Sequence, residues 1–119
     1  MSQPSLLVVD DELLIRDLLY DFFSDQGWTI AVAENGEKAL DILKSRKIDL
    51  ILSDIKMPEM DGLELTARVH EQYPQIPVVL MTGEGSFEEG DPRASRVATV
   101  LSKPFGLDDL ERTVNNFVA

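Results

Sequence analysis

Three consecutive carboxylates follow a short apolar run near the start of the chain, in the stretch LLVVDDE from Leu6 to Glu12. Like charges this close repel one another unless a cation lies among them. A hard divalent cation such as Mg²⁺ prefers carboxylate oxygens together with phosphate oxygens and water. The stretch is therefore either a solvated helix start, where acidic residues favour the positive end of the helix dipole, or part of a magnesium site.

Other residues that could do chemistry end the later apolar runs. Asp10 and Asp11 end the first run, Asp54 the third, Thr82 the fourth and Lys103 the fifth. In a parallel sheet the carboxyl ends of the strands meet at one edge, which is where open α/β sheets bind ligands. With strand order 2-1-3-4-5, the first and third strands flank the point where the order reverses. We therefore expect Asp10, Asp11 and Asp54 to converge there.

Such a site fits phosphoryl transfer. A carboxylate can act as the nucleophile and form an aspartyl phosphate. The transfer then depends mainly on charge neutralisation and in-line positioning. Mg²⁺, the Lys103 ammonium and the Thr82 hydroxyl could all contact the phosphoryl oxygens. A bound cation would also remove the repulsion within the acidic run.

Short apolar runs alternate with amphipathic segments along the chain. The runs predict strands covered on both faces at Leu6–Val9, Trp28–Ala33, Leu50–Ser53, Pro77–Met81 and Ala98–Ser102. Apolar residues at helical spacing predict helices at Glu12–Gln26, Glu37–Arg46, Leu63–Tyr73 and Leu107–Val118. This alternation predicts an α/β, doubly wound, flavodoxin-like fold. Right-handed crossovers restrict the topologies to a few, of which we expect a five-stranded parallel sheet of order 2-1-3-4-5 with helices on both faces.

Two helical segments carry more specific predictions. In the first helix we expect an apolar stripe of Leu14, Leu18, Leu19, Phe22 and Phe23, with the opposite side formed by Arg16, Asp17, Asp21 and Asp25. A fourth helix, expected between Gly83 and Arg96, has the sequence GEGSFEEGDPRASR. Because Pro92 fits only the first turn of a helix, this helix is predicted to be short or irregular.

Length and charge restrict the function further. The 119 residues predict one domain, spanning residues 1–119. A net charge of −11 argues against binding to nucleic acid and to anionic membranes. The chain has no cysteine, which excludes disulfides and thiolate metal sites. Its start does not read as a signal peptide, and no apolar run approaches the ~20 residues of a membrane helix. We therefore expect a cytoplasmic protein.

Four motifs together resemble the receiver domain of the two-component response regulators, over essentially the whole chain. They are VVDDE, LILSDIKMPEMDG around Asp54, MTG at Thr82 and SKPF at Lys103. The DD pair or the KP pair alone would be weak, but the four motifs together, in this order and at this spacing, are highly specific to the family. The resemblance implies a stand-alone receiver similar to those of chemotaxis and phosphorelays.

The resemblance also implies roles for individual residues. Asp54 would be the phosphoacceptor. The Mg²⁺ ligands would be Asp11 and Asp54 directly, Asp10 through water and the backbone carbonyl of Lys56. Lys103, followed by a cis bond to Pro104, would pair with the phosphoryl group, and Thr82 would move toward the phosphoryl oxygens.

The chain departs from the family pattern close to the fifth strand. Most relatives carry Tyr or Phe three residues before the lysine, whereas this chain has Val100. The residue after Thr82 is Gly83 rather than the more frequent alanine, which should loosen that loop. With an irregular fourth helix, these differences put the usual aromatic relay in doubt and leave the phosphorylation chemistry intact.

The predicted function is that of a single-domain response regulator and not of an enzyme acting on other substrates. It would accept a phosphoryl group on Asp54 from a phosphohistidine of a sensor kinase or phosphotransfer protein. It would catalyse only its own phosphorylation and dephosphorylation. The added charge would then bias a surface that binds a downstream protein, or the phosphoryl group would pass onward. By resemblance, the first helix and the loop before the last helix would face the kinase.

Two functions of other classes are alternatives. The first is a Mg²⁺-dependent phosphohydrolase with an aspartate nucleophile, as in the haloacid dehalogenase group. That group carries an Asp-x-Asp motif after the first strand, whereas this chain has Asp10-Asp11-Glu12. The second alternative is an interaction module that works without phosphorylation. The complete set of acids, threonine and lysine argues against such a loss of chemistry.

Overall fold

The computed structural model describes residues 3–82, 99–102 and 106–117. The strands are β1 (Ser5–Val9), β2 (Thr29–Ala33), β3 (Leu50–Asp54), β4 (Val78–Thr82) and β5 (Thr99–Ser102). The helices of the described residues are α1 (Leu13–Asp25), α2 (Gly36–Ser45), α3 (Gly62–Gln72) and α4 (Leu107–Asn115). Each predicted strand and each of these helices is confirmed, with bounds that differ by one to three residues.

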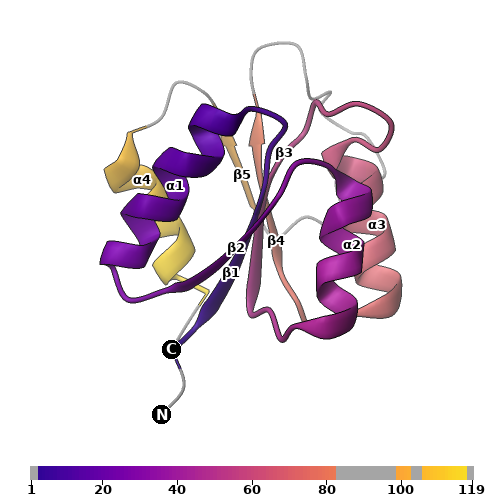
Figure 1. Cartoon of the computed structure of the whole chain (residues 1–119), viewed down its shortest axis with the longest axis horizontal. Helices are drawn as coiled ribbons and strands as arrows, with labels where there is room; N and C mark the ends of the chain where they lie inside the picture. Colours follow the sequence, from indigo (N-terminus) through magenta and orange to yellow (C-terminus); the bar gives the residue numbers. More distant parts are fainter. Residues whose placement is uncertain (1–2, 83–98, 103–105, 118–119) are drawn as a thin grey trace.

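The five strands form one parallel sheet with the order β2-β1-β3-β4-β5. Helices α1 and α4 cover one face of the sheet, and α2 and α3 cover the other (Figure 1). The predicted fold class and strand order are therefore confirmed. The irregular helix predicted between Gly83 and Arg96 lies outside the described residues.

The sheet separates two apolar clusters, because side chains of each strand alternate between its faces. One cluster lies between the sheet and α2 and α3, and includes Leu7, Val9, Ala39, Ile51, Leu65 and Leu80. The other lies against α1 and α4, and includes Val8, Phe23, Trp28, Leu52, Met81 and Leu110. Burial on both sides explains why β1, β3 and β4 read as nearly continuous apolar runs.

Helix α1 does not bury the stripe predicted for it. Leu19 and Phe23 are buried, as expected, but Leu14 is 81 % exposed and Leu18 is 49 % exposed. The apolar residues of this helix cover more than half of its circumference, so only part of them can face the sheet. The prediction was wrong for Leu14 and Leu18, which lie on the outer surface. Arg16 lies partly buried instead of on the solvent side.

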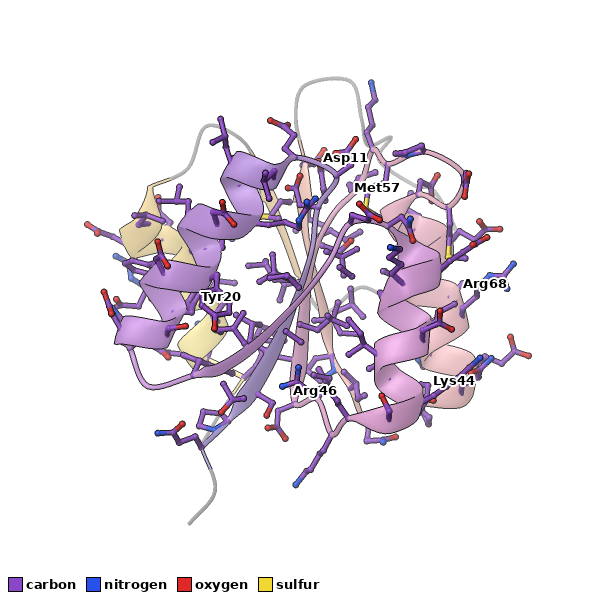
Figure 2. The ribbon with its side chains drawn as sticks, viewed as in Figure 1. Asp11, Tyr20, Lys44, Arg46, Met57 and Arg68 are labelled. Carbon is purple, nitrogen blue, oxygen red and sulfur yellow. The ribbon has the colours of Figure 1, made fainter. Side chains whose placement is uncertain are left out.

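Labelled side chains identify the two ends of the sheet. Asp11 and Met57 lie at the end where the strands finish, whereas Lys44 and Arg46 lie at the opposite end (Figure 2). At that opposite end the Asp49 carboxylate accepts a hydrogen bond of 2.8 Å from the backbone amide of Ser5. Within the described residues, none of the helices combines the length and the apolar character needed to cross a bilayer.

Candidate functional site

Asp10 and Asp54 lie at the same level on adjacent strands. Val9 of β1 pairs with Ser53 of β3, and each aspartate is the next residue along its strand direction. Alternation directs both side chains to the face of α1 and α4, because Val8 and Leu52 belong to the cluster on that face. Asp10 is fully buried and Asp54 is 7 % exposed. The register therefore places these two aspartates at neighbouring strand ends, on the same face of the sheet.

The loop from β1 to α1 gathers three carboxylates. The Oδ1 atom of Asp10 accepts a hydrogen bond of 2.9 Å from the Glu12 amide, and the Asp10 amide donates to the carbonyl of Ala33 at 3.1 Å. One oxygen each of Asp10, Asp11 and Glu12 lie within 4.8 Å of one another. Asp54 is not in this group. The turn therefore concentrates negative charge, and it includes Glu12, which the predicted ligand set had left out.

One backbone amide bonds the Asp54 carboxylate, and the Ser53 hydroxyl bonds the Asp54 backbone. Its Oδ1 atom accepts a hydrogen bond of 2.8 Å from the amide of Ile55. The hydroxyl of Ser53 donates to the Asp54 carbonyl at 2.8 Å. The Ile55 amide also donates to the carbonyl of Met81 at 3.1 Å, so the ladder between β3 and β4 continues past Asp54. The Ile55 amide thus orients one carboxylate oxygen, and the other two bonds hold the backbone at the end of the strand.

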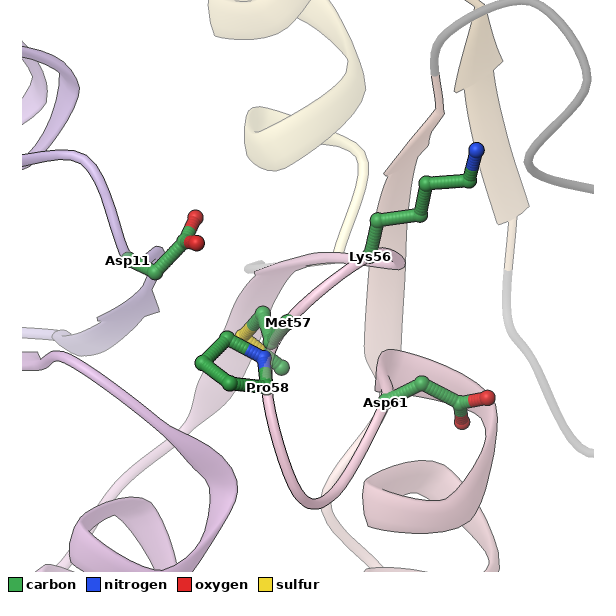
Figure 3. A pocket seen from close by; sticks show the side chains of 5 residues that line it. All are labelled: Asp11, Lys56, Met57, Pro58 and Asp61. Carbon is green, nitrogen blue, oxygen red and sulfur yellow. The ribbon is translucent and has the colours of Figure 1, made fainter.

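An open pocket of about 340 Å³ lies beside these acids. It is lined by Asp11, Lys56, Met57, Pro58 and Asp61. Asp11 points toward the pocket from the β1 side, while the Lys56 side chain extends away from Asp11 (Figure 3). Two of the lining residues, Asp11 and Asp61, carry carboxylates. This donor chemistry suits a hard cation such as Mg²⁺ with phosphate oxygens beside it.

The other two predicted site residues follow β4 and β5. Thr82 is the last residue of β4, is buried, and pairs with Ser102 of β5. The described part of the chain thus brings Thr82 to the same edge of the sheet as Asp54. Lys103 directly follows Ser102 in the sequence, but it and the bond to Pro104 lie outside the described residues. Val100 is half-buried and packs against the cluster under α2 and α3.

Arg16 contacts the acidic loop, which the sequence analysis did not predict. Its Nη1 atom donates a hydrogen bond of 2.7 Å to the backbone carbonyl of Asp10. Arg16 also acts on Glu34 in the loop after β2. The side-chain hydrogen bond from Lys38 lowers the pKa of Glu34, and the charge of Arg16 adds a smaller lowering. An arginine within an amphipathic helix pattern does not indicate that its side chain contacts the backbone of a neighbouring loop.

The loop between β3 and α3 is tightly folded. Glu59 has a positive φ of 71°, a conformation that side chains other than glycine adopt at a cost. The Gly62 amide donates to the carbonyl of Ile55 at 2.7 Å, which brings the start of α3 back to the end of β3. The Oδ1 atom of Asp61 caps α3 by accepting from the Glu64 amide at 2.8 Å. The segment MPEMDG therefore shapes the floor of the pocket.

Comparison with known proteins agrees with this geometry. The family described as "Response regulator receiver domain" matches residues 6–115. Sporulation initiation phosphotransferase F of Bacillus subtilis is 34 % identical over 119 residues, which cover 99 % of this chain and 96 % of that protein. Other curated relatives are longer, and the chain spans 14 % of one, 25 % of another and 26 % of a third.

Solved structures are similar over the same length. The response regulator TrrA from Thermotoga maritima, in complex with Mg²⁺–BeF, has a TM-score of 0.87 and 32 % identity. The alignment covers 97 % of this chain and 99 % of TrrA. A structure of the histidine kinase ThkA in complex with TrrA matches with a TM-score of 0.87 and 33 % identity, covering 98 % and 99 % of the two chains.

Proposed function

Because this chain belongs to the response regulator receiver domain family, we propose that it accepts a phosphoryl group on Asp54 in a Mg²⁺-dependent reaction. The donor is a phosphohistidine of a sensor kinase or of a phosphotransfer protein. The level placement of Asp10 and Asp54 on β1 and β3, with Asp11 at the pocket beside them, is the observation that supports this most directly.

The proposed step is a direct transfer. An Asp54 oxygen attacks phosphorus, a new O–P bond forms, and the P–N bond of the phosphohistidine breaks to give an acyl phosphate and a free imidazole. Bound Mg²⁺ would neutralise phosphoryl oxygens in this site. Asp11, Asp54 and the Lys56 carbonyl would hold the ion directly, and Asp10 through water. Thr82 and Lys103 would contact the phosphoryl oxygens.

The fixed carboxylate favours this step. The Ile55 amide bonds one Asp54 oxygen at 2.8 Å, so the carboxylate does not have to be reoriented before it reacts. The pocket is open to solvent, which gives a donor phosphoryl group a route of approach. The single transferred group then adds roughly −1.5 to −2 charges to this edge of the sheet.

The exposed apolar residues of α1 support a protein donor. Leu13, Leu14 and Leu18 lie on the outer surface of α1, at its end next to Asp11, and are 60 %, 81 % and 49 % exposed. Apolar side chains gathered beside a reactive site are typical of a docking surface. The TrrA structure in complex with the kinase ThkA shows that a similar chain binds a histidine kinase. We propose that this surface of α1 contacts the donor protein.

Output follows as a change in protein binding or as onward transfer of the phosphoryl group. The similarity to a sporulation phosphotransferase over nearly its full length supports the relay as one form of output. The alternative of a phosphohydrolase acting on small phosphate esters makes a different prediction, because such an enzyme turns over many substrate molecules per site.

Intact-mass measurement tests the proposal. The wild-type chain, incubated with acetyl phosphate and Mg²⁺, should gain the mass of one phosphoryl group. Asp54→Asn should gain none, and wild type in excess EDTA should gain none. Asp41→Asn is a matched control, because it makes the same substitution at an exposed carboxylate on α2 and leaves Asp54 intact. An equal gain in Asp54→Asn, or steady hydrolysis of a generic phosphate ester, would contradict the proposal.

A further inference from the structure

We infer that Arg16 is a positioning residue for the magnesium site, which it serves by fixing the peptide that joins Asp10 to Asp11. This inference rests on the proposed function, because it concerns the same metal site. The observation that carries it is the 2.7 Å hydrogen bond from Nη1 of Arg16 to the Asp10 carbonyl.

The contact is made to backbone and not to a carboxylate. Arg16 lies one turn into α1, with its amide donating to the Glu12 carbonyl at 3.1 Å. Its side chain reaches back to the end of β1, so helix and strand are joined through one guanidinium. The Asp10 amide is bonded to Ala33 on β2 at 3.1 Å. Both backbone groups of Asp10 are therefore anchored, one by the sheet and one by Arg16.

Peptide geometry transmits this anchoring to Asp11. The peptide unit is planar and trans, so its carbonyl and the following amide point in opposite directions. A carbonyl of Asp10 held toward Arg16 fixes the plane of that peptide and hence the direction in which the Asp11 backbone leaves it. Among the described residues, no hydrogen bond or ion pair holds the exposed Asp11 carboxylate itself. Its placement at the pocket thus depends on the backbone.

A simpler role for Arg16 predicts the opposite effect on metal affinity. If Arg16 only offset the charge of the acidic loop, its removal would relieve repulsion with an incoming dication and Mg²⁺ would bind more tightly. If Arg16 positions Asp11, its removal weakens Mg²⁺ binding, as loss of residues that orient metal ligands commonly does. The sign of the change separates the two roles.

Calorimetric titration of the full chain with MgCl₂ provides the test. Arg16→Met should bind Mg²⁺ about tenfold more weakly than wild type. Lys38→Met is the matched control, since it also removes one cation close to Glu34 and has no hydrogen bond to the acidic loop in the described structure. It should bind Mg²⁺ with wild-type or higher affinity. Arg16→Lys keeps a hydrogen-bond donor and a positive charge. On a logarithmic scale of Mg²⁺ affinity, it should recover at least half of the loss seen in Arg16→Met.

Each outcome decides the inference. Unchanged or tighter binding by Arg16→Met overturns it, as does an Arg16→Lys variant no better than Arg16→Met. Urea unfolding in EDTA should show that the variants are folded at the titration temperature. If Arg16→Met is not folded, the test uses Arg16→Lys instead and follows its amide chemical shifts during the MgCl₂ titration. An Asp11 amide that responds to Mg²⁺ as it does in wild type overturns the inference. A wild-type chain that binds no Mg²⁺ overturns the proposed function as well.

Discussion

Gly62 at the start of α3 packs directly against the backbone carbonyl of Asp54. A Cβ atom added at Gly62 would meet that carbonyl oxygen and would lie 2.9 Å from the Cα of Ile55. Real Cβ atoms do not approach backbone so closely. The glycine therefore allows the loop after β3 to close beneath the proposed phosphoacceptor.

Substitution of this glycine should damage both fold and site. Gly62→Ala should lower the free energy of unfolding by about 2 kcal/mol, because the backbone on both sides must shift to admit the methyl group. Urea unfolding measures this change. Gly106→Ala is the control, since a Cβ there meets nothing closer than 3.9 Å. If Gly62→Ala were as stable as wild type, Gly62 would have to lie farther from the Asp54 carbonyl than the structure places it.

Replacement of Glu59 by glycine should stabilise the folded chain. Its φ of 71° costs a residue with a side chain about 1 to 2 kcal/mol, whereas glycine adopts it freely. Part of the gain is lost because glycine makes the unfolded chain more flexible. We expect Glu59→Gly to raise the free energy of unfolding by about 0.5 kcal/mol in thermal or urea unfolding. A destabilised variant would mean that the Glu59 side chain makes a contact worth more than the strain.

Mg²⁺ should stabilise the folded chain through Asp11. A ligand that binds only the folded state at ten times its dissociation constant adds about 1.4 kcal/mol. Thermal unfolding with and without MgCl₂ should show this gain for wild type, and its loss in Asp11→Asn. Asp41→Asn, which removes an exposed carboxylate from α2, should keep it. An equal gain in Asp11→Asn would place the ion elsewhere on this acidic surface.

The outer surface of α1 should affect transfer from a protein and not from a small donor. Leu14→Gln and Leu18→Gln should change the free energy of unfolding by less than about 0.5 kcal/mol, because both residues are exposed. The rate of phosphorylation by a phosphohistidine donor protein active on wild type should fall by about fivefold, equivalent to about 1 kcal/mol. Phosphorylation by acetyl phosphate should not change.

Val32→Thr provides the control for this surface. Val32 is also an exposed aliphatic residue, 38 % accessible, but it lies on the edge strand β2 rather than on α1. The Val32→Thr variant should be phosphorylated at the wild-type rate both by the donor protein and by acetyl phosphate. A loss of protein-dependent transfer in Val32→Thr equal to that in Leu14→Gln would mean that the effect is not specific to α1.

The strands could be predicted from sequence, because burial on both faces of the sheet leaves short apolar runs. The level of the acids then followed from the strand order of the doubly wound fold. The face of α1 could not be predicted. Its apolar residues exceed what one face can bury, and only packing decides that Phe23 turns inward while Leu14 turns outward. The contact from Arg16 to the Asp10 carbonyl was missed for a related reason: a bond to backbone leaves no signature in residue types. The positive φ of Glu59 was equally hidden, since no glycine marks it.

A crystal structure of the chain with Mg²⁺ and beryllium fluoride would show whether Asp11 and Asp54 share one ion. We expect one ion about 2.0 to 2.1 Å from oxygens of both residues, with the fluoride complex attached to Asp54. An ion held by Asp10, Asp11 and Glu12 alone, with no fluoride complex on Asp54, would contradict this expectation.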